Sequence, residues 1–310
     1  MNVIRGLRNI KRFKNPVVAM GVFDGVHRAH QRILRAAVAK ARAIGGISIV
    51  LTFDPHPQKE DRISSLEHRL QLMDQLGIQV AIVLQFNKQF AKISADDFIR
   101  DILVRRISVD YVYVGKNFRF GESACGDVRL LRRYAEVFHF KLKVFPVITL
   151  HERSVSSTYI RRLIVQGKLS RAQRLLGRPV SILGTVIHGT AWGRRLGFPT
   201  ANLNPHHEVL PPAGIYAVLV KIEQKKYKGV CYIGRKPIVG PAVLRYSQSS
   251  QLTIEVTILN FNENIYGKYI EVQFLKKIRN EQQFLSSALL IKQIKKDIIK
   301  AKEHFSRHSF

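Results

Sequence analysis

The chain has 310 residues, which is long enough for two domains of ordinary size that each bury a core of their own. Its apolar content of 46% is typical of globular proteins and argues against global disorder, and no run of about 18 apolar residues predicts a membrane span. The 51 Lys and Arg against 22 Asp and Glu give a net charge of +29, which favours polyanionic partners such as nucleotides or nucleic acid.

The positive charge is spread along the chain, and no RNA-recognition signature, zinc finger or aromatic–basic repeat accompanies it. We therefore expect salt-sensitive affinity for nucleic acid, but no specific nucleic-acid partner and no membrane partner. The basic N-terminus lacks an apolar signal core and is interpreted as a first strand, with an organelle-targeting segment as the alternative. Cys125 and Cys231 lie far apart without metal or redox spacing, so we expect a cytoplasmic setting. The oligomeric state is not predicted.

The first half of the chain alternates apolar runs with helical patterns. The apolar runs are 17–23, 47–53, 80–86, 111–115 and 143–148. The helical patterns lie around 30–44, 66–77, 96–106 and 127–139. Continuous apolar strands separated by helices predict a parallel sheet covered on both faces. The fold class is therefore α/β, with a doubly wound Rossmann-like domain that binds ligands at the carboxyl ends of its strands.

The second half is different, because its segments are short, rich in β-formers and interrupted by Gly and Pro. The predicted strands are 181–188, 214–224, 227–233, 251–260 and 268–276. This pattern predicts a small antiparallel β-barrel. A closing helix is expected to dock on the barrel through a seam of apolar residues, Phe284, Ala288, Ile291, Ile294 and Ile298. We place the domains at 1–178 and 179–310.

One stretch of the first domain, "GVFDGVHRAHQRIL" from Gly21 to Leu34, combines a tight corner with two histidines. Four interpretations compete: a metal site, a catalytic base, a phosphate cradle or a capped helix without chemistry. Zinc needs three or four ligands, and only His27 and His30 are at hand. The cradle is favoured because the corner opens a helix, whose N-terminal N–H groups attract anions, and because Gly21 and Gly25 allow close approach. The cap remains the alternative.

Further motifs follow in order along the chain. They are "TFDPHP" (52–57), "VGKNFRFG" (114–121), "SVSSTYIRRLIVQGKL" (154–169), the join "LLGRP" (175–179) and "GTVIHGTAWGRRLGFPTANL" (184–203). Together with the histidine corner, this ordered set resembles the bacterial bifunctional riboflavin kinase/FAD synthetases. The corner resembles the HxGH motif of the nucleotidylyltransferase superfamily. The resemblance covers essentially the whole chain.

This resemblance implies that the first domain joins FMN to the adenylyl group of ATP, forming FAD and pyrophosphate. It implies that His27 and His30 bind the ATP phosphates and the developing charge, and that Arg161 holds the leaving pyrophosphate. The implied ATP site is Gly21, Phe23, Asp24, Gly25, His27, His30, Ser156, Ser157, Thr158 and Arg161. The implied flavin site of this domain is Asp54, His56, Asn117, Phe118 and Arg119. A helix cap is the alternative for the Ser-Ser-Thr run.

For the barrel, the resemblance implies ATP-dependent phosphorylation of riboflavin to FMN. The nucleophile of that reaction is a neutral hydroxyl, so a carboxylate that accepts its proton is expected, and the resemblance points to Glu255. Strand alternation leaves open that Glu255 simply faces solvent. Thr200 and Asn202 match the family's Mg–ATP residues, so Mg²⁺ is the expected cofactor. The implied ATP site of the barrel is Gly184, Gly189, Gly193, Gly197, Pro199, Thr200 and Asn202, with the glycines forming a flexible flap.

The sequence departs from the family pattern at four positions. Family members have Gly where Ala29 stands, Asn where Val22 stands, Asp where Asn117 stands and Thr where Ile238 stands. Three alternatives therefore remain beside the bifunctional enzyme. They are a riboflavin kinase with a degenerate first domain, a nucleotidyltransferase for another small phosphate ester, and a basic nucleic-acid-binding protein.

Overall fold

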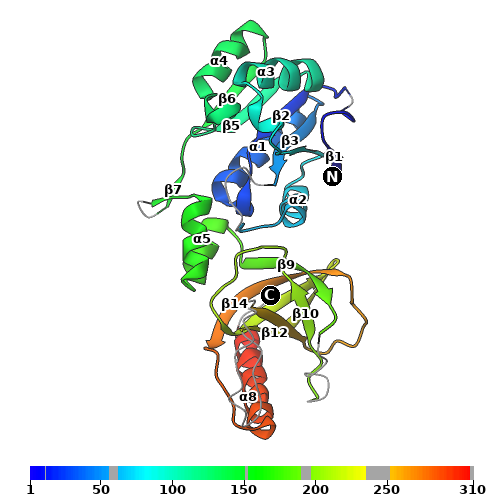
Figure 1. Ribbon diagram of the computed structural model, residues 1–310, viewed down its shortest axis with the longest axis vertical. Helices are drawn as coiled ribbons and strands as arrows, with labels where there is room; N and C mark the ends of the chain where they lie inside the picture. The colour runs from blue at the N-terminus through cyan, green and yellow to red at the C-terminus, as the bar shows by residue number, and fades with distance from the viewer. Residues whose placement is uncertain (11, 56–61, 151–152, 190–196, 235–251, 308–310) are drawn as a thin grey trace. The chain divides into compact units, whose positions relative to one another are not determined.

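The computed structural model describes residues 1–10, 12–55, 62–150, 153–189, 197–234 and 252–307 (Figure 1). His56, Gly193 and Ile238 lie outside these residues. The chain divides into two compact units, Met1–Ile160 and Arg161–Phe310. The domain boundary at 178/179 stays a prediction.

A parallel sheet forms the centre of the first unit, with the strand order β1-β4-β3-β2-β5-β6 (Figure 1). Its strands are β1 (Asn2–Arg5), β2 (Pro16–Met20), β3 (Ile47–Asp54), β4 (Val80–Gln85), β5 (Tyr111–Gly115) and β6 (Lys141–Phe145). The predicted parallel sheet is confirmed, and so is the interpretation of the N-terminus as a strand. The winding direction reverses between β2 and β5, which is the point where doubly wound sheets bind ligands.

Helices cover both faces of this sheet, as the apolar runs predicted. They are α1 (Arg28–Ala43), α2 (Leu66–Gln75), α3 (Ala95–Asp97) with the π-helix η3 (Phe98–Ile107), and α4 (Val128–Val137). Alternate residues of β2 enter two cores: Val18 and Met20 pack with η3 and α4, whereas Val17 and Ala19 pack with α1 and α2. Three short helices, η1 (Asp24–Val26), η2 (Phe90–Lys92) and η4 (Glu122–Ala124), lie in the connections.

Several short elements were not predicted, because two to nine residues carry too little periodicity. The hairpin of β7 (Thr149–Leu150) and β8 (Arg153–Ser154) precedes α5 (Ser157–Val165) and α6 (Leu169–Leu176). The fifth predicted apolar run, 143–148, was placed too late, because the strand occupies Lys141–Phe145.

In the second unit, six described strands close an antiparallel barrel in the order β10-β13-β12-β11-β14-β9. They are β9 (Val180–Ile187), β10 (Ala201–Asn204), β11 (Gly214–Ile222), β12 (Lys225–Gly234), β13 (Thr253–Ile258) and β14 (Tyr269–Arg279). The predicted barrel is confirmed, but β10 was missed. This four-residue strand pairs with both β9 and β13 and completes the closure.

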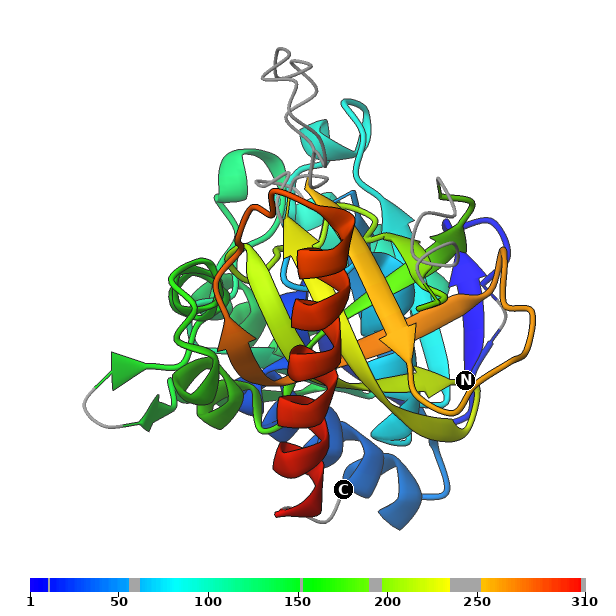
Figure 2. The same ribbon diagram turned by 90° about the horizontal axis from the view of Figure 1, so that it is seen from below.

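The helix α8 (Ser287–Ser306) packs along the barrel, as Figure 2 shows. Its predicted apolar seam was partly wrong, since Ala288 is exposed and Phe284 precedes the helix. The buried residues are Leu290, Asp297, Ala301 and Phe305. Asp297 is buried because Arg279 of β14 donates to both of its carboxylate oxygens at 2.8 to 3.0 Å, a contact that periodicity does not reveal.

Among the described residues, no helix combines the length and the apolar character needed to cross a bilayer.

Candidate active sites

The corner between β2 and α1 is a strained turn. Phe23 has φ 56° and Val26 has φ 37°, left-handed values that are unfavourable for a bulky and a β-branched residue. Gly25 also has a positive φ of 75°, and a Cβ there would lie 2.9 Å from the side chain of Ile63. Glycine is therefore required at this position by both backbone geometry and space. Such strain is typical of functional loops.

The two histidines lie against each other at the start of α1. Their rings stack with centroids 3.5 Å apart, and Nδ1 of His27 accepts a 3.4 Å hydrogen bond from the backbone N–H of His30. His27 therefore caps α1, and the phosphate cradle stays a prediction. Because Nδ1 accepts, a neutral His27 carries its proton on Nε2 and can donate from there. The cap and the phosphate cradle are compatible.

His30 is held in its neutral form. Burial, the neighbouring His27 and the charge of Arg69 together lower the pKa of His30 well below its usual value. Its ring also meets Phe23 edge-on, with centroids 5.3 Å apart. Within the part of the chain that the structure describes, the buried Nδ1 of His30 has no hydrogen-bond partner. A buried polar atom of this kind favours a position beside a ligand or an ordered water.

Asp24 fixes the loops around the corner. This residue is 3% exposed, and its carboxylate accepts hydrogen bonds from the backbone N–H groups of Ile63 at 2.9 Å and Ser64 at 3.2 Å. Its backbone carbonyl accepts a hydrogen bond from the hydroxyl of Ser157 at 2.9 Å. The structure therefore brings the Ser-Ser-Thr motif to the histidine corner, although 133 positions separate the two residues.

The rest of that motif lies on or next to α5. The hydroxyl of Ser156 accepts a hydrogen bond from the backbone N–H of Tyr159 at 3.4 Å, as a helix cap does. Thr158 is exposed, and Arg161 follows Ser157 by one helical turn. Because residues four apart lie on one face of a helix, Ser157 and Arg161 share a face of α5.

The predicted flavin residues of this unit follow strands on either side of β2. Asp54 ends β3 and Asn117 lies in the turn after β5, so the parallel sheet brings both to the edge where the corner lies. Phe118 is half-buried, and its ring stacks on that of Phe120 with the ring centroids 5.7 Å apart. Arg119 is exposed, and its Nη1 lies 3.7 Å from Oδ2 of Asp127 in an ion pair. Phe118 therefore contributes partly to the core.

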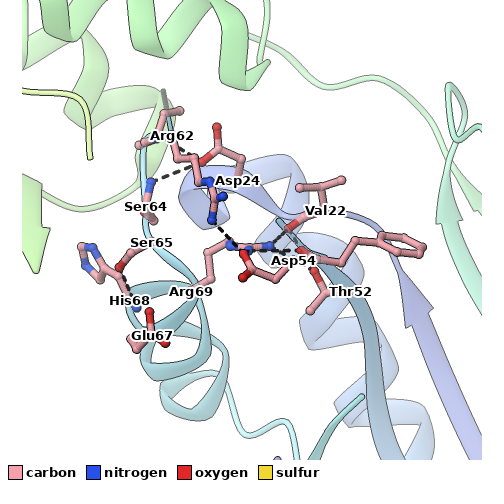
Figure 3. Close-up of polar contacts among 12 residues, drawn as sticks. Val22, Asp24, Thr52, Asp54, Arg62, Ser64, Ser65, Glu67, His68 and Arg69 are labelled. Atoms are coloured by element: carbon pink, nitrogen blue, oxygen red, sulfur yellow. Dashed lines mark hydrogen bonds and ion pairs between the residues drawn. The ribbon is translucent and has the colours of Figure 1, made fainter. Parts of the chain in front are cut away.

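Sequence reasoning missed Arg69, the most buried charged side chain near the corner at 1% exposure (Figure 3). Its Nη1 donates to the carbonyl of Val22 at 2.6 Å and to the hydroxyl of Thr52 at 3.1 Å. Its Nη2 donates to the carbonyl of Phe53 and to Oδ1 of Asp54, both at 3.3 Å. The available signal was an arginine on the otherwise apolar face of α2.

In the barrel, the candidate site is a row of side chains across β10 and β13. Thr200 precedes β10, and its hydroxyl donates to Oε2 of Glu255 at 3.4 Å. Asn202 lies directly opposite Glu255 in the β10–β13 pairing. The three residues predicted for phosphate, metal and proton transfer are thus brought together, and Glu255 is half-buried. Its polar neighbours disfavour the alternative of a side chain that simply faces solvent.

On the other side of Glu255 lies Tyr232, its pairing partner in β12. The hydroxyl of Tyr232 donates to Glu281 at 2.5 Å, and burial together with this carboxylate raises the pKa of the phenol. Tyr232 is thus a hydrogen-bond donor at the flank of the site, and no motif pointed to it.

The predicted glycine flap is only partly a loop. Gly184 lies within β9, in the barrel wall, where a Cβ would come within 2.8 Å of the carbonyl of Asn204, so its assignment to a flexible flap was wrong. Gly189 follows β9, and a Cβ there would collide with the Asn202 amide. Gly197 has a positive φ of 84° and, like Pro199, lies before β10.

The comparisons with known proteins agree with the division of the chain into a parallel-sheet unit and a barrel unit. A family model described as FAD synthetase matches residues 9–159, and one described as riboflavin kinase matches residues 176–305. The chain is 34% identical to a bifunctional riboflavin kinase/FMN adenylyltransferase of Buchnera aphidicola (subspecies Schizaphis graminum), over 99% of both proteins. The identity to the Escherichia coli K12 protein of the same name is also 34%, over 98% of both. The chain belongs to this family.

Membership in the riboflavin kinase/FMN adenylyltransferase family makes the chain a transferase with two activities. A relative of the same name from Bacillus subtilis is 34% identical over 94% of this chain and 92% of its own length. A crystal structure from Streptococcus pneumoniae, described as a macrolide-efflux protein, covers all of both chains with a TM-score of 0.80 and 28% identity. The arrangement of a parallel-sheet unit followed by a barrel therefore recurs in a solved structure.

Proposed function

We propose that the parallel-sheet unit carries out adenylyl transfer and that the barrel carries out riboflavin phosphorylation. The FAD synthetase match spans the first region and the riboflavin kinase match the second. The barrel uses ATP and riboflavin to form FMN and ADP. The sheet unit uses ATP and FMN to form FAD and pyrophosphate.

In adenylyl transfer, a phosphate oxygen of FMN attacks the α-phosphorus of ATP, and the bond from that phosphorus to the oxygen bridging to the β-phosphate breaks. The nucleophile is already an anion at pH 7, so the site needs positioning and charge stabilisation rather than a strong base. His27 and His30 supply imidazoles, and the start of α1 supplies backbone N–H groups that favour anions. Gly25 permits close approach of the phosphates.

The hydroxyls of Ser157 and Thr158 and the guanidinium of Arg161 complete the phosphate site in this proposal, with Arg161 holding the leaving pyrophosphate. The tether from Ser157 to Asp24 supports it, because it brings the motif to the corner. Ala29 lies in the first turn of α1 without a left-handed φ, so the helix geometry there does not require glycine. We expect this departure to be tolerated.

The flavin of the adenylyl-transfer site is assigned to the neighbouring strand ends. Asp54 and Asn117 provide polar groups, Phe118 an aromatic ring and Arg119 a positive charge. Gly21, Phe23 and Asp24 shape the corner. His56 remains part of this prediction, outside the described residues.

In the kinase reaction, Glu255 accepts the proton of the terminal ribityl hydroxyl as its oxygen attacks the γ-phosphorus of ATP and ADP leaves. Thr200 and Asn202 hold the phosphates, and the backbone around Gly184, Gly189 and Gly197 shapes the approach. The observation that carries this assignment is the 3.4 Å contact of Thr200 with Glu255, opposite Asn202.

Mg²⁺ fits the donors in this part of the barrel. The hydroxyl of Thr200, the carboxylate of Glu255 and the amide oxygen of Asn202 are hard oxygen donors of the kind that Mg²⁺ prefers. The described portion holds no group of three or more His, Cys, Asp or Glu that could bind a metal ion without other ligands. Such a site suits a cation that keeps several waters and binds with its substrate phosphates. When bound, Mg²⁺ would neutralise phosphate charge, with Thr200 and Asn202 as its protein ligands.

The first test is to incubate the purified chain with riboflavin and Mg–ATP and to separate the flavins by chromatography. We expect FMN to appear first and FAD after it. FMN without FAD would overturn the assignment of adenylyl transfer and favour a kinase with a degenerate first domain. Neither product, together with sequence-specific RNA binding that survives high salt, would favour the nucleic-acid-binding alternative.

A further inference from the structure

We propose that Arg69 is a positioning residue for adenylyl transfer, fastening the strained β2–α1 corner to the end of β3. The inference rests on the proposed adenylyl transfer in this unit. Arg69 lies on α2, and none of the motifs that led to the proposed function includes it.

The contacts of Arg69 reach both sides of the candidate site (Figure 3). One nitrogen of its guanidinium holds the carbonyl of Val22, two residues before the corner's η1 helix, and the hydroxyl of Thr52. The other holds the carbonyl of Phe53 and the carboxylate of Asp54. A single planar group therefore joins the phosphate-binding corner to the residue predicted to contact flavin.

The shape of the guanidinium matters for this role. Its acceptors are divided between two nitrogens in one plane, whereas a lysine would offer a single ammonium at one point. Thr52 is fully buried and its hydroxyl also donates to the carbonyl of Val22 at 3.2 Å, so the corner is held from two directions. Lysine would keep the charge at this position and lose the geometry.

The charge of Arg69 has a second effect. Arg69 is surrounded by Asp54, Asp24, Glu67 and Arg62, and Arg62 donates to the same Oδ1 of Asp54 at 2.7 Å. Burial lowers the pKa of Arg69, and the carboxylates oppose that shift, so the group stays protonated. Its charge is one cause of the lowered pKa of His30, together with burial and His27.

These two effects can be separated by two variants of the full chain, Arg69→Lys and Arg69→Met. We expect both to lower the kcat of FMN adenylylation by about 10- to 100-fold, the effect of misplacing reacting groups, while riboflavin phosphorylation by the same molecules is unchanged. By NMR titration of the His30 ring, we expect Arg69→Met to raise the pKa of His30 and Arg69→Lys to leave it low. A residue that only stabilises the fold would change the amount of folded enzyme and would leave the kcat of the folded molecules unchanged.

Thr52→Val serves as a milder variant if the Arg69 variants do not fold, because it removes one acceptor of the guanidinium at constant volume. We expect it to lower the adenylylation kcat severalfold, again with kinase activity intact. Arg105→Met is the matched control, since Arg105 is exposed and pairs only with Asp101 on η3 within the described structure. It should change neither activity.

The outcomes distinguish this inference from the proposed function. Absence of FAD formation by the unmodified chain would remove the proposed function and the inference with it. In another outcome, the unmodified chain forms FAD while the folded Arg69→Lys and Thr52→Val variants show an adenylylation kcat within twofold of it. That result would overturn the positioning role of Arg69 and leave the proposed function intact. An unchanged His30 titration in Arg69→Met would overturn the electrostatic part.

Discussion

The corner after β2 and the β10–β13 row of the barrel differ in the charge of the groups that they present and in the elements that carry these groups. The corner presents imidazoles and a helix N-terminus. The guanidinium of Arg69 donates to the carbonyl of Val22 in this corner, and the Asp24 carboxylate accepts from backbone N–H groups. The barrel row presents a half-buried carboxylate, Glu255, on a strand beside a hydroxyl and an amide. The first arrangement suits an anionic ligand, and the second suits the removal of a proton.

This difference follows the protonation state of each nucleophile. A phosphate of FMN is already an anion and needs donors around it, whereas a ribityl hydroxyl must lose its proton during the reaction. Helix N-termini supply donors, and strands supply side chains at fixed spacing without a large dipole. The two sites can thus be tested separately in one chain.

Glu255→Gln gives the largest expected effect and tests the barrel half. The amide cannot accept the hydroxyl proton, so we expect FMN formation to fall by about 10²- to 10⁴-fold. Adenylylation of supplied FMN should continue unchanged. Rates of both steps are measured by flavin chromatography, with exposed Glu223→Gln as the matched control on the same barrel. Unchanged FMN formation in Glu255→Gln would remove this residue from the mechanism.

His30→Ala tests the corner in the opposite sense. Removal of one hydrogen-bond donor from an oxyanion-stabilising site lowers kcat by about 10²- to 10³-fold. We expect the rate of FAD formation to fall by that amount and the rate of FMN formation to stay unchanged. His139→Ala, an exposed histidine of the same unit, is the control. FAD output equal to that of the unmodified chain would contradict the phosphate-cradle interpretation.

Asp297→Asn gives the smallest expected effect on catalysis. It tests whether the barrel can be destabilised without destabilising the parallel-sheet unit. Breaking the buried pair with Arg279 leaves an uncompensated charge, and we expect the free energy of unfolding of the barrel to fall by about 3–5 kcal/mol. On heating, kinase activity should therefore be lost at a lower temperature than adenylyl transfer. Exposed Glu303→Gln on the same helix should stay within about 0.5 kcal/mol. Parallel loss of both activities would contradict independent stabilities of the two units.

The sequence by itself predicted the parallel sheet, the barrel and the closing helix, because runs of apolar residues and their periods report burial locally. The glycines and histidines of the corner were found for a similar reason, since a strand-to-helix turn is a contiguous feature. Short elements such as β10 carry too few residues for a period, and their assignment depended on partners in β9 and β13.

Only the tertiary structure identified Arg69 and Asp297 as buried. Each is a charged residue on a helix, and such residues are almost never fully buried unless they are paired. Arg69 stays inside because acceptors 15 to 47 positions away surround it, and Asp297 because Arg279, 18 positions away, neutralises it. The low pKa of His30 likewise depends on Arg69 in another element. Local periodicity determined the fold, whereas the electrostatics of the site were decided by contacts that the chain makes only after it has folded.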